Sequence, residues 1–366
     1  MSQQDAFQEG NVDIISLDLM GSDLGAGELI LGASKFLEIN PKVRFLMYGD
    51  SKVCLPILDS YRELKNCSSF HHCDVSIAMD ERPADALRRG RNVSSMWCAI
   101  DAVKKNKAGS VVTAGNTGAL IAMSRLCLSK ISGVDRPSLA AFWPTFKGKC
   151  IILDVGATIG FTVPHMIQLS ILGSFFARSA LGIKRPSVGL LNVGTEEIKG
   201  HDVLQESTRI LRGGCCDAFE YKGFIEANDI SQGVVDVVVT EGFSGNIAIK
   251  AAEGTVVLVS EVLKKALQRT LLSRTGYLFI KGSLQEVKDE FDPRNFNGGV
   301  LLGVDGLVVK GHGSSDARSI VNVLDIARNM SHNGFIDMVK NDMQRVRDIL
   351  LDADAHEKNI MSGSSK

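Results

Sequence analysis

The sequence has no long apolar run, few aromatic residues and almost no net charge. Phe, Trp and Tyr make up 6% of the 366 residues, and 41 basic residues against 42 acidic ones leave a formal net charge of −1. The composition therefore gives no argument for nucleic-acid binding. No apolar run is long enough to span a bilayer, and the start, Met1-Ser2-Gln3-Gln4-Asp5, lacks the basic and apolar regions of a secretory signal.

Several common motifs are also missing. The eight cysteines form no Cys-x-x-Cys pair, which is typical of the reducing cytosol, so we expect a cytoplasmic protein. There is no Gly-x-x-x-x-Gly-Lys-Ser/Thr loop, no Gly-x-Gly-x-x-Gly after the first expected strand and no Gly-x-Ser-x-Gly turn. ATP hydrolysis, ordinary dinucleotide binding and serine hydrolysis consequently lose support.

Short apolar segments alternate with helix-like patterns along most of the chain. This alternation predicts a largely parallel sheet covered by helices on both faces, in three layers. We expect one large α/β domain over residues 11–350, with flexible ends at residues 1–10 and 354–366. The strands are expected at residues 13–18, 43–50, 111–113, 150–154, 188–192, 235–240 and 307–309.

Three polar, glycine-containing loops follow expected strands and lead into helix-like stretches, at residues 114–119, 241–246 and 312–316. A helix start offers unpaired backbone N–H groups and the positive end of the helix dipole, so each loop is a candidate anion site. Ligands of such sheets bind beyond the carboxyl ends of the strands. The candidate phosphate-binding residues are Gly115, Asn116, Thr117, Gly118, Ser244, Gly245, Gly313, Ser314 and Ser315.

The first strand and the last loop carry further candidates. Asp18 and Asp23 flank a turn that contains Gly21, and their carboxylates either cap the next helix or orient a substrate. His312 is either a hydrogen-bonded structural residue or an acid–base group, because histidine titrates near neutrality. Nothing else in the sequence indicates a metal site.

Two other strand ends carry lysines. Glu197 and Lys199 either form a solvated ion pair or place the Lys199 ammonium against phosphate. Lys250, on the helix-like stretch after Asn246, either lies at the surface or serves phosphate in the same way.

Residues 254–292 break the alternation and predict a projecting helical hairpin. A long helical pattern over residues 254–270 is followed by an apolar stretch at 271–281, with basic residues at its flanks, and by a helix-like stretch at 283–290. The apolar stretch, taken as the tip of the hairpin, either packs in the core or a dimer interface or makes transient contact with a membrane.

Taken in order, these segments resemble those of the PlsX family, the bacterial phosphate acyltransferases of phospholipid synthesis. Each segment alone is a weak signal, but the whole series in the same order is specific. The matching residues are 18–23, 94–96, 114–120, 133–137, 153–157, 190–194, 196–200, 242–246 and 312–315.

The resemblance implies a Rossmann-like fold akin to the isocitrate and isopropylmalate dehydrogenases, and a homodimer. It implies transfer of a fatty acyl group from acyl carrier protein to inorganic phosphate. Because nucleotide-binding motifs and metal-site residues are missing from the sequence, we expect no metal or other cofactor. The acyl phosphate product would supply a membrane glycerol-3-phosphate acyltransferase, so peripheral contact with the inner face of the membrane is also expected. Within this family we assign His312, Lys199, Asp18 and Asn246 to catalysis and the remaining candidates to substrate binding.

The chain departs from the family pattern in a few places. Ser22 replaces a glycine, and Glu241 and Ser244 replace Asp and Thr. After residues 154–157 the family carries Asn and, two residues later, Asp, where this chain has Thr158 and Gly160. These last changes remove an amide and a carboxylate, so no catalytic role is assigned to that loop.

Three other activities fit parts of the pattern. A phosphotransacetylase-like enzyme would use acetyl-CoA rather than a long-chain acyl carrier protein. A decarboxylating dehydrogenase of the same fold would need nicotinamide and a divalent metal. A non-catalytic binder of acyl carrier protein would release no thiol.

Overall fold

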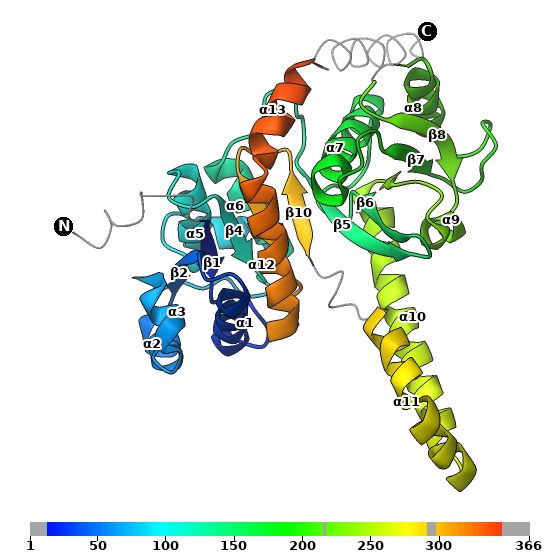
Figure 1. The fold of residues 1–366 in the computed structure, drawn as a ribbon. Helices are drawn as coiled ribbons and strands as arrows, with labels where there is room; N and C mark the ends of the chain where they lie inside the picture. The colour runs from blue at the N-terminus through cyan, green and yellow to red at the C-terminus, as the bar shows by residue number, and fades with distance from the viewer. Residues whose placement is uncertain (1–12, 215–216, 291–297, 346–366) are drawn as a thin grey trace.

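The computed structural model describes residues 13–214, 217–290 and 298–345, and an 11-stranded sheet runs through it (Figure 1). The predicted flexible ends, residues 1–10 and 354–366, lie outside the described residues. The strand order is β3-β2-β1-β4-β11-β10-β5-β6-β9-β7-β8. The strands are β1 Ile14–Asp18, β2 Arg44–Gly49, β3 Ser68–His72, β4 Ser110–Thr113, β5 Ser138–Thr145, β6 Gly148–Leu153, β7 Ser187–Leu191, β8 Glu220–Ile225, β9 Val237–Val239, β10 Gly299–Leu302 and β11 Leu307–Lys310.

Helices cover both faces of the sheet and complete the three predicted layers. Figure 1 shows β1, β2 and β4 with α1 to α6 on one side of the molecule, and β5 to β9 with α7 to α9 on the other. The helices are α1 Ala26–Ile39, α2 Ser51–Leu58, α3 Arg62–Asn66, α4 Pro83–Gly90, α5 Ser95–Lys104, α6 Thr117–Cys127, α7 Val163–Leu181, α8 Asp202–Arg212, α9 Ala227–Gln232, α10 Gly242–Gln268, α11 Leu271–Glu290, α12 Ala317–His332 and α13 Phe335–Arg345.

Strand direction divides the sheet into two groups. Neighbours are parallel within β3-β2-β1-β4-β11 and within β6-β9-β7-β8. Between the groups, β10 is antiparallel to β11 and β5, and β5 is antiparallel to β6, so the second group runs in the reverse direction. The sheet is largely parallel, as predicted. Its carboxyl ends, however, do not form one row, and the polar loops fall into two sets.

The strands read as apolar runs because both faces of the sheet are buried. In β4, Val111 belongs to the core cluster under α5 and α6, whereas Val112 belongs to the cluster under α1 and α12. Alternation along a strand sends successive side chains to opposite faces, which accounts for this division. The long helix α7 is apolar on most sides, and Phe175 and Phe176 on it are fully buried, so it forms part of the core.

The predicted hairpin is present, but its bounds differ from the prediction. α10 begins at Gly242, directly after β9, and α11 starts at Leu271, so residues 271–281 are helical and the turn lies at residues 269–270. The side chains of Thr270 and Ser273 cap this turn reciprocally: the Ser273 N–H donates to Thr270 Oγ1 at 3.0 Å, and the Thr270 N–H donates to Ser273 Oγ at 3.0 Å. The hairpin projects well beyond the body of the molecule (Figure 1).

Candidate active site

The loops after β1, β4 and β11 meet at one edge of the sheet. A Cβ atom on Gly21 would lie 2.6 Å from the Cα of Gly115, so only glycine allows these two loops to approach so closely. The Asp23 N–H donates to the Gly313 carbonyl at 2.9 Å, and Ser22 Oγ donates to the same carbonyl at 3.1 Å. The structure therefore brings the predicted residues of these loops together.

Asp18 lies behind these loops and joins them. It ends β1 and is buried, and its Oδ2 accepts a hydrogen bond from Thr113 Oγ1 at 2.7 Å. Burial raises the pKa of the Asp18 carboxyl, while hydrogen bonds from Ser95, Thr113 and the Met20 N–H oppose this effect. These partners come from β4, α5 and the turn itself, so Asp18 is placed to position the loops. Its predicted catalytic role stays a prediction.

Asn116 anchors a neighbouring loop through its side chain, and its expected part in phosphate binding stays a prediction. Its Oδ1 accepts from the Ala119 N–H at 3.0 Å and thereby caps α6. Its Nδ2 donates to the carbonyls of Ala78, Met79 and Glu81 at 3.1, 2.9 and 2.8 Å, which leaves the amide fully engaged. The backbone of Thr117 and Gly118, in the first turn of α6, remains the candidate anion contact of this loop.

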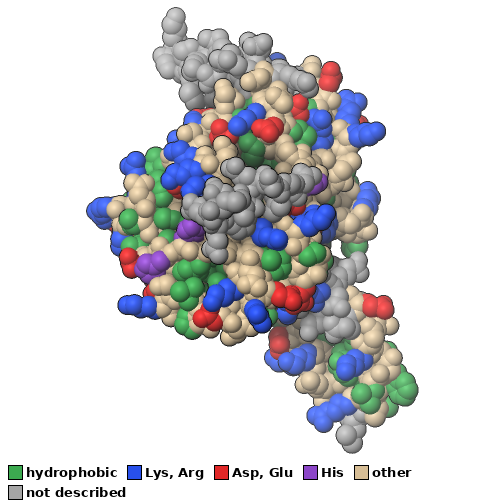
Figure 2. Space-filling view, turned by 60° about the vertical axis from the view of Figure 1, so that its left-hand side comes forward, with side chains coloured by type: hydrophobic (Ala, Val, Ile, Leu, Met, Phe, Trp, Pro, Cys, Tyr) green, Lys and Arg blue, Asp and Glu red, His purple; other side chains and the backbone are tan. Residues whose placement is uncertain are grey.

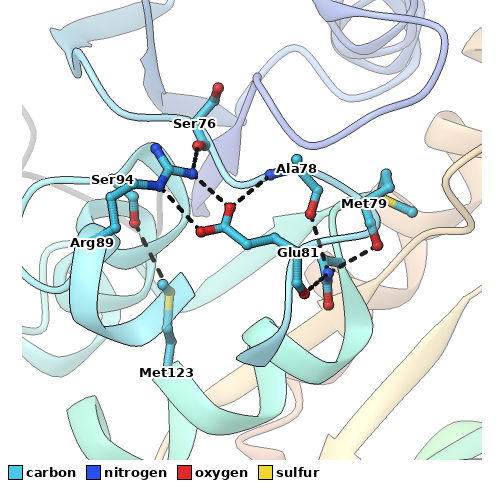
Figure 3. A network of polar contacts seen from close by, with 8 residues as sticks. Ser76, Ala78, Met79, Glu81, Arg89, Ser94 and Met123 are labelled. Atoms are coloured by element: carbon cyan, nitrogen blue, oxygen red, sulfur yellow. Dashed lines mark hydrogen bonds and ion pairs between the residues drawn. The ribbon is translucent and has the colours of Figure 1, made fainter. Parts of the chain in front are cut away.

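A salt bridge holds the loop that Asn116 anchors. Arg89 meets Glu81 through two hydrogen bonds, Nε to Oε1 at 3.1 Å and Nη2 to Oε2 at 2.6 Å, and its Nη2 also donates to the Ser76 carbonyl at 2.7 Å. Figure 3 shows Arg89 and Glu81 facing one another, with Ala78 and Met79 on the same loop. A Cβ atom on Gly313 would lie 2.6 Å from Met79 Cε, so this loop forms one side of the site.

His312 stands exposed at the end of β11. The Ser314 N–H donates to His312 Nδ1 at 3.3 Å, and Ser314 Oγ lies 2.8 Å from the same nitrogen. Because Nδ1 accepts a hydrogen bond, the proton of the neutral ring belongs on Nε2. The imidazole is thus held in one orientation by its own loop.

Carboxylates of the protein itself cap the helix starts after β11 and β9, while the expected phosphate contacts of the residues there stay predictions. α12 begins at Ala317, after Ser314 and Ser315; the Ala317 N–H donates to Glu28 Oε2 at 2.7 Å and the Ser319 N–H to Asp316 Oδ1 at 2.9 Å. The protein's own carboxylates already occupy the positive end of this helix.

The same holds for α10. Glu241 accepts from the Phe243 N–H at 2.8 Å and from the Ser244 N–H at 2.6 Å, one bond to each carboxylate oxygen. The predicted phosphate contacts of Ser244 and Gly245 therefore cannot rest on unpaired N–H groups. The long Glu241 side chain folds back onto the helix start and serves as its cap.

The second set of loops packs around Asp154. This buried carboxylate accepts from the N–H groups of Leu139, Gly156, Ala157 and Thr158 and from Thr158 Oγ1 at 2.8 Å. The Thr158 hydroxyl thus has a structural partner at a position where the sequence departs from the family. On α10, Asn246 lies beside the same loop, because a Cβ atom on Gly156 would be 3.7 Å from it.

Lys199 and Glu197 lie apart from the first set of loops. Lys199 is 48% exposed and pairs with Glu196 at 2.9 Å, and Glu197 pairs with Arg212. In the described structure Lys199 pairs with Glu196, Ser314 holds His312, and Asn246 lies beside the loop at Gly156. Their roles stay predictions.

Sequence reasoning missed Lys310, the last residue of β11. Its side chain is only 8% exposed, and its Nζ donates to the Gly311 carbonyl at 2.6 Å. Burial lowers the pKa of Lys310 to about 8, with Asp23 raising it and Lys250 of α10 lowering it further. The sequence did contain a signal for this residue, because Lys310 is a charged residue at the end of an apolar strand.

The assembled site combines cations, an imidazole and backbone donors. Lys310 and Lys250 supply positive charge, His312 supplies an oriented ring nitrogen, and the first turn of α6 supplies N–H groups. This is a set of groups that binds a small anion and moves a proton. Among the described residues, no group of three or more His, Cys, Asp or Glu side chains could hold a metal ion.

Solved structures with a similar fold include two phosphotransacetylases. The phosphotransacetylase of Streptococcus pyogenes covers 88% of this chain and 94% of its own, with a TM-score of 0.59 and 16% identity. The EutD phosphotransacetylase of Staphylococcus aureus covers 90% and 97%, with a TM-score of 0.57 and 15% identity. At such identities the likeness defines the class of fold, a three-layer α/β sandwich with a largely parallel sheet.

The sequence comparisons identify the family. Residues 14–338 match the family described as "Fatty acid synthesis protein". The proteins named phosphate acyltransferase of Rhizobium rhizogenes and Rhizobium meliloti are 50% and 48% identical over 331 residues, which is 90% of this chain and 95% of each relative. The Brucella anthropi protein of the same name is 46% identical over 329 residues, 90% of this chain and 94% of its own. The chain therefore belongs to the PlsX family and is an acyltransferase.

Proposed function

We propose that this protein transfers a long-chain fatty acyl group from acyl carrier protein to inorganic phosphate, giving acyl phosphate for phosphatidic acid synthesis. The observation that carries the proposal is the identity of about half of all aligned residues to proteins named phosphate acyltransferase. The loops after β1, β4 and β11 support the proposal as well, because they carry positively charged groups and phosphate is a dianion that binds to such groups.

The reaction needs no covalent enzyme intermediate. An oxygen of HPO₄²⁻ attacks the thioester carbon, a tetrahedral oxyanion forms, and the carbon–sulfur bond then breaks. The phosphate proton leaves and the departing thiolate gains one, so the products are acyl phosphate dianion and free thiol. The protein must hold phosphate and thioester in line, stabilise the oxyanion and move that proton.

His312 is placed for the proton transfer. Ser314 contacts Nδ1 through its hydroxyl and its N–H, which fixes the orientation of the imidazole ring. The imidazole first accepts the proton of the attacking phosphate and then donates a proton to the departing sulfur. This is general acid–base catalysis. The N–H groups of Thr117 and Gly118 are the candidate donors to the oxyanion, and one such donor contributes roughly 3 kcal/mol.

Thiol release tests the proposal. Purified protein is incubated with palmitoyl-acyl carrier protein, and free thiol is measured with and without phosphate. We expect release that requires phosphate and needs no nicotinamide nucleotide, and slower turnover of acetyl-CoA. Preference for acetyl-CoA would favour a phosphotransacetylase-like enzyme. Binding of the carrier protein without thiol release would leave a non-catalytic binder.

We also propose that the hairpin contacts anionic lipid on the inner face of the membrane. Leu278 and Phe279 on α11 are 71% and 90% exposed, and Val257, Leu258 and Val262 on α10 are exposed as well. Figure 2 shows apolar side chains beside Lys and Arg on the projecting hairpin. No helix in the described part of the chain is long and apolar enough to cross a bilayer. Apolar surface with a basic flank suits an interfacial position instead.

Liposome binding distinguishes the membrane from a second subunit as the partner of the hairpin. We expect the protein to sediment with anionic liposomes at low salt and to be released by high salt, because exposed charges are screened. The double substitution Leu278→Glu and Phe279→Glu should abolish sedimentation and spare soluble acyl transfer. If that variant instead becomes monomeric and inactive, the hairpin is a subunit contact of the expected homodimer. Delivery of acyl phosphate to a membrane glycerol-3-phosphate acyltransferase would be favoured if the hairpin binds the liposomes.

A further inference from the structure

Lys310 is a buried cation to which the described residues supply no counter-ion. It is the last residue of β11, between Thr113 of β4 and Gly299 of β10, and its side chain is 8% exposed. An ammonium has three N–H donors, and in the part of the chain that the structure describes this group donates to the Gly311 carbonyl at 2.6 Å. Among the residues that the structure describes, no carboxylate lies within ion-pair distance of it.

A buried ammonium with unused donors is costly unless an anion pairs with it. Asp23 lies near enough to influence Lys310, yet it does not form an ion pair with it. Lys250, an exposed residue of α10, lowers the pKa of Lys310 further, so its positive charge acts on the same ammonium. Two cations and one distant carboxylate leave an excess of positive charge, which a dianion can balance.

We propose that Lys310 binds the inorganic phosphate nucleophile directly, with Lys250 as a second, more exposed contact. This inference rests on the proposed function. Phosphate fits better than the thioester, because the thioester carbonyl is neutral in the ground state whereas HPO₄²⁻ carries two charges to match two ammonium groups. His312 follows Lys310 by two residues, so a phosphate bound to Lys310 would lie near the imidazole that accepts its proton.

The kinetic test separates phosphate binding from binding of the acyl donor. Lys310→Met removes the charge and keeps an apolar stem of similar length. We expect the KM for phosphate to rise at least tenfold while the KM for the acyl-thioester changes less than twofold. Lys35→Met, an exposed lysine on the outer surface of α1, is the matched control and should leave both constants unchanged. An unchanged KM for phosphate in Lys310→Met would overturn the inference.

A direct measurement of phosphate binding tests the inference independently of the acyl-transfer reaction. Titration calorimetry with inorganic phosphate and no acyl donor should give binding to the wild-type protein and to Lys35→Met, and a loss of at least tenfold in Lys310→Met. Equal phosphate affinity in the wild type and Lys310→Met overturns the inference even if thiol release succeeds. Loss of phosphate binding in the variant supports it even if the carrier protein proves to be the wrong donor. Should Lys310→Met fail to fold by circular dichroism, Lys310→Gln takes its place.

Discussion

Replacing Lys310 by methionine should make the protein without bound phosphate more stable at pH 7. Burial lowers the pKa of Lys310 from 10.5 to about 8. Because one pKa unit corresponds to about 1.4 kcal/mol, the charged form costs about 3 kcal/mol in the folded state. The substitution also removes the hydrogen bond to Gly311, which lowers the free energy of unfolding by about 1 kcal/mol. The variant should therefore be more stable than the wild type by about 2 kcal/mol.

The gain should depend on pH in a defined direction. Between about pH 8 and pH 10.5 the folded wild type binds fewer protons at Lys310 than the unfolded chain does, so its stability rises with pH in that window. Below pH 8 the cost of the charge is present in full. The advantage of Lys310→Met should therefore be largest at pH 7 and shrink as the pH approaches 10.

Scanning calorimetry at pH 7, 8, 9 and 10 measures this effect. With an unfolding entropy of about 2.1 cal/mol/K per residue, a gain of about 2 kcal/mol raises the Tm of a chain of this size by roughly 3 °C. Phosphate should raise the Tm of the wild type and not that of the variant, because a ligand of the folded state stabilises it. A variant that is less stable than the wild type by the same amount at every pH would refute the reasoning.

Three further substitutions test the roles of individual side chains. Asn116→Ala frees the loop at residues 78–81 and uncaps α6, so we expect a loss of about 2 kcal/mol in stability, measured by urea unfolding, and a fall in acyl transfer. Glu241→Ala should cost about 1 kcal/mol through the lost cap of α10, whereas Glu261→Ala, at an exposed position on the same helix, should cost little. His312→Ala should lower kcat at least tenfold with an unchanged circular dichroism spectrum, and full activity would remove it from the reaction.

The fold could be predicted from the sequence where the signal is local. The expected strands at residues 13–18 and 43–50 correspond to β1 and β2, because an apolar run between turn residues marks a buried strand. The antiparallel β5 and β10 were not predicted. β5 and β10 pair although they lie far apart in the chain. Together with the pairs β10–β11 and β5–β6, this pairing reverses the direction of the second group of strands. No local pattern predicts the long-range pairing of β5 with β10.

The site was predictable in part for the same reason. Because parallel strands end at one edge, the meeting of Gly21, Gly115 and Gly313 follows from the alternation of strands and helices. The carboxylates that cap the starts of α10 and α12 could not be predicted from this alternation. Glu28 reaches the start of α12 across 289 residues of sequence. The burial of Lys310 is likewise a property of the packed chain.

The filled helix starts change how the site is understood. A helix start attracts any carboxylate that can reach it, and in α10 and α12 the protein supplies its own. These helices are thereby stabilised, but their positive ends are no longer available to a substrate. Selection of an external anion then falls to groups that no internal carboxylate neutralises. In the described structure those include the ammonium of Lys310, on which the charge of Lys250 acts, and the first turn of α6.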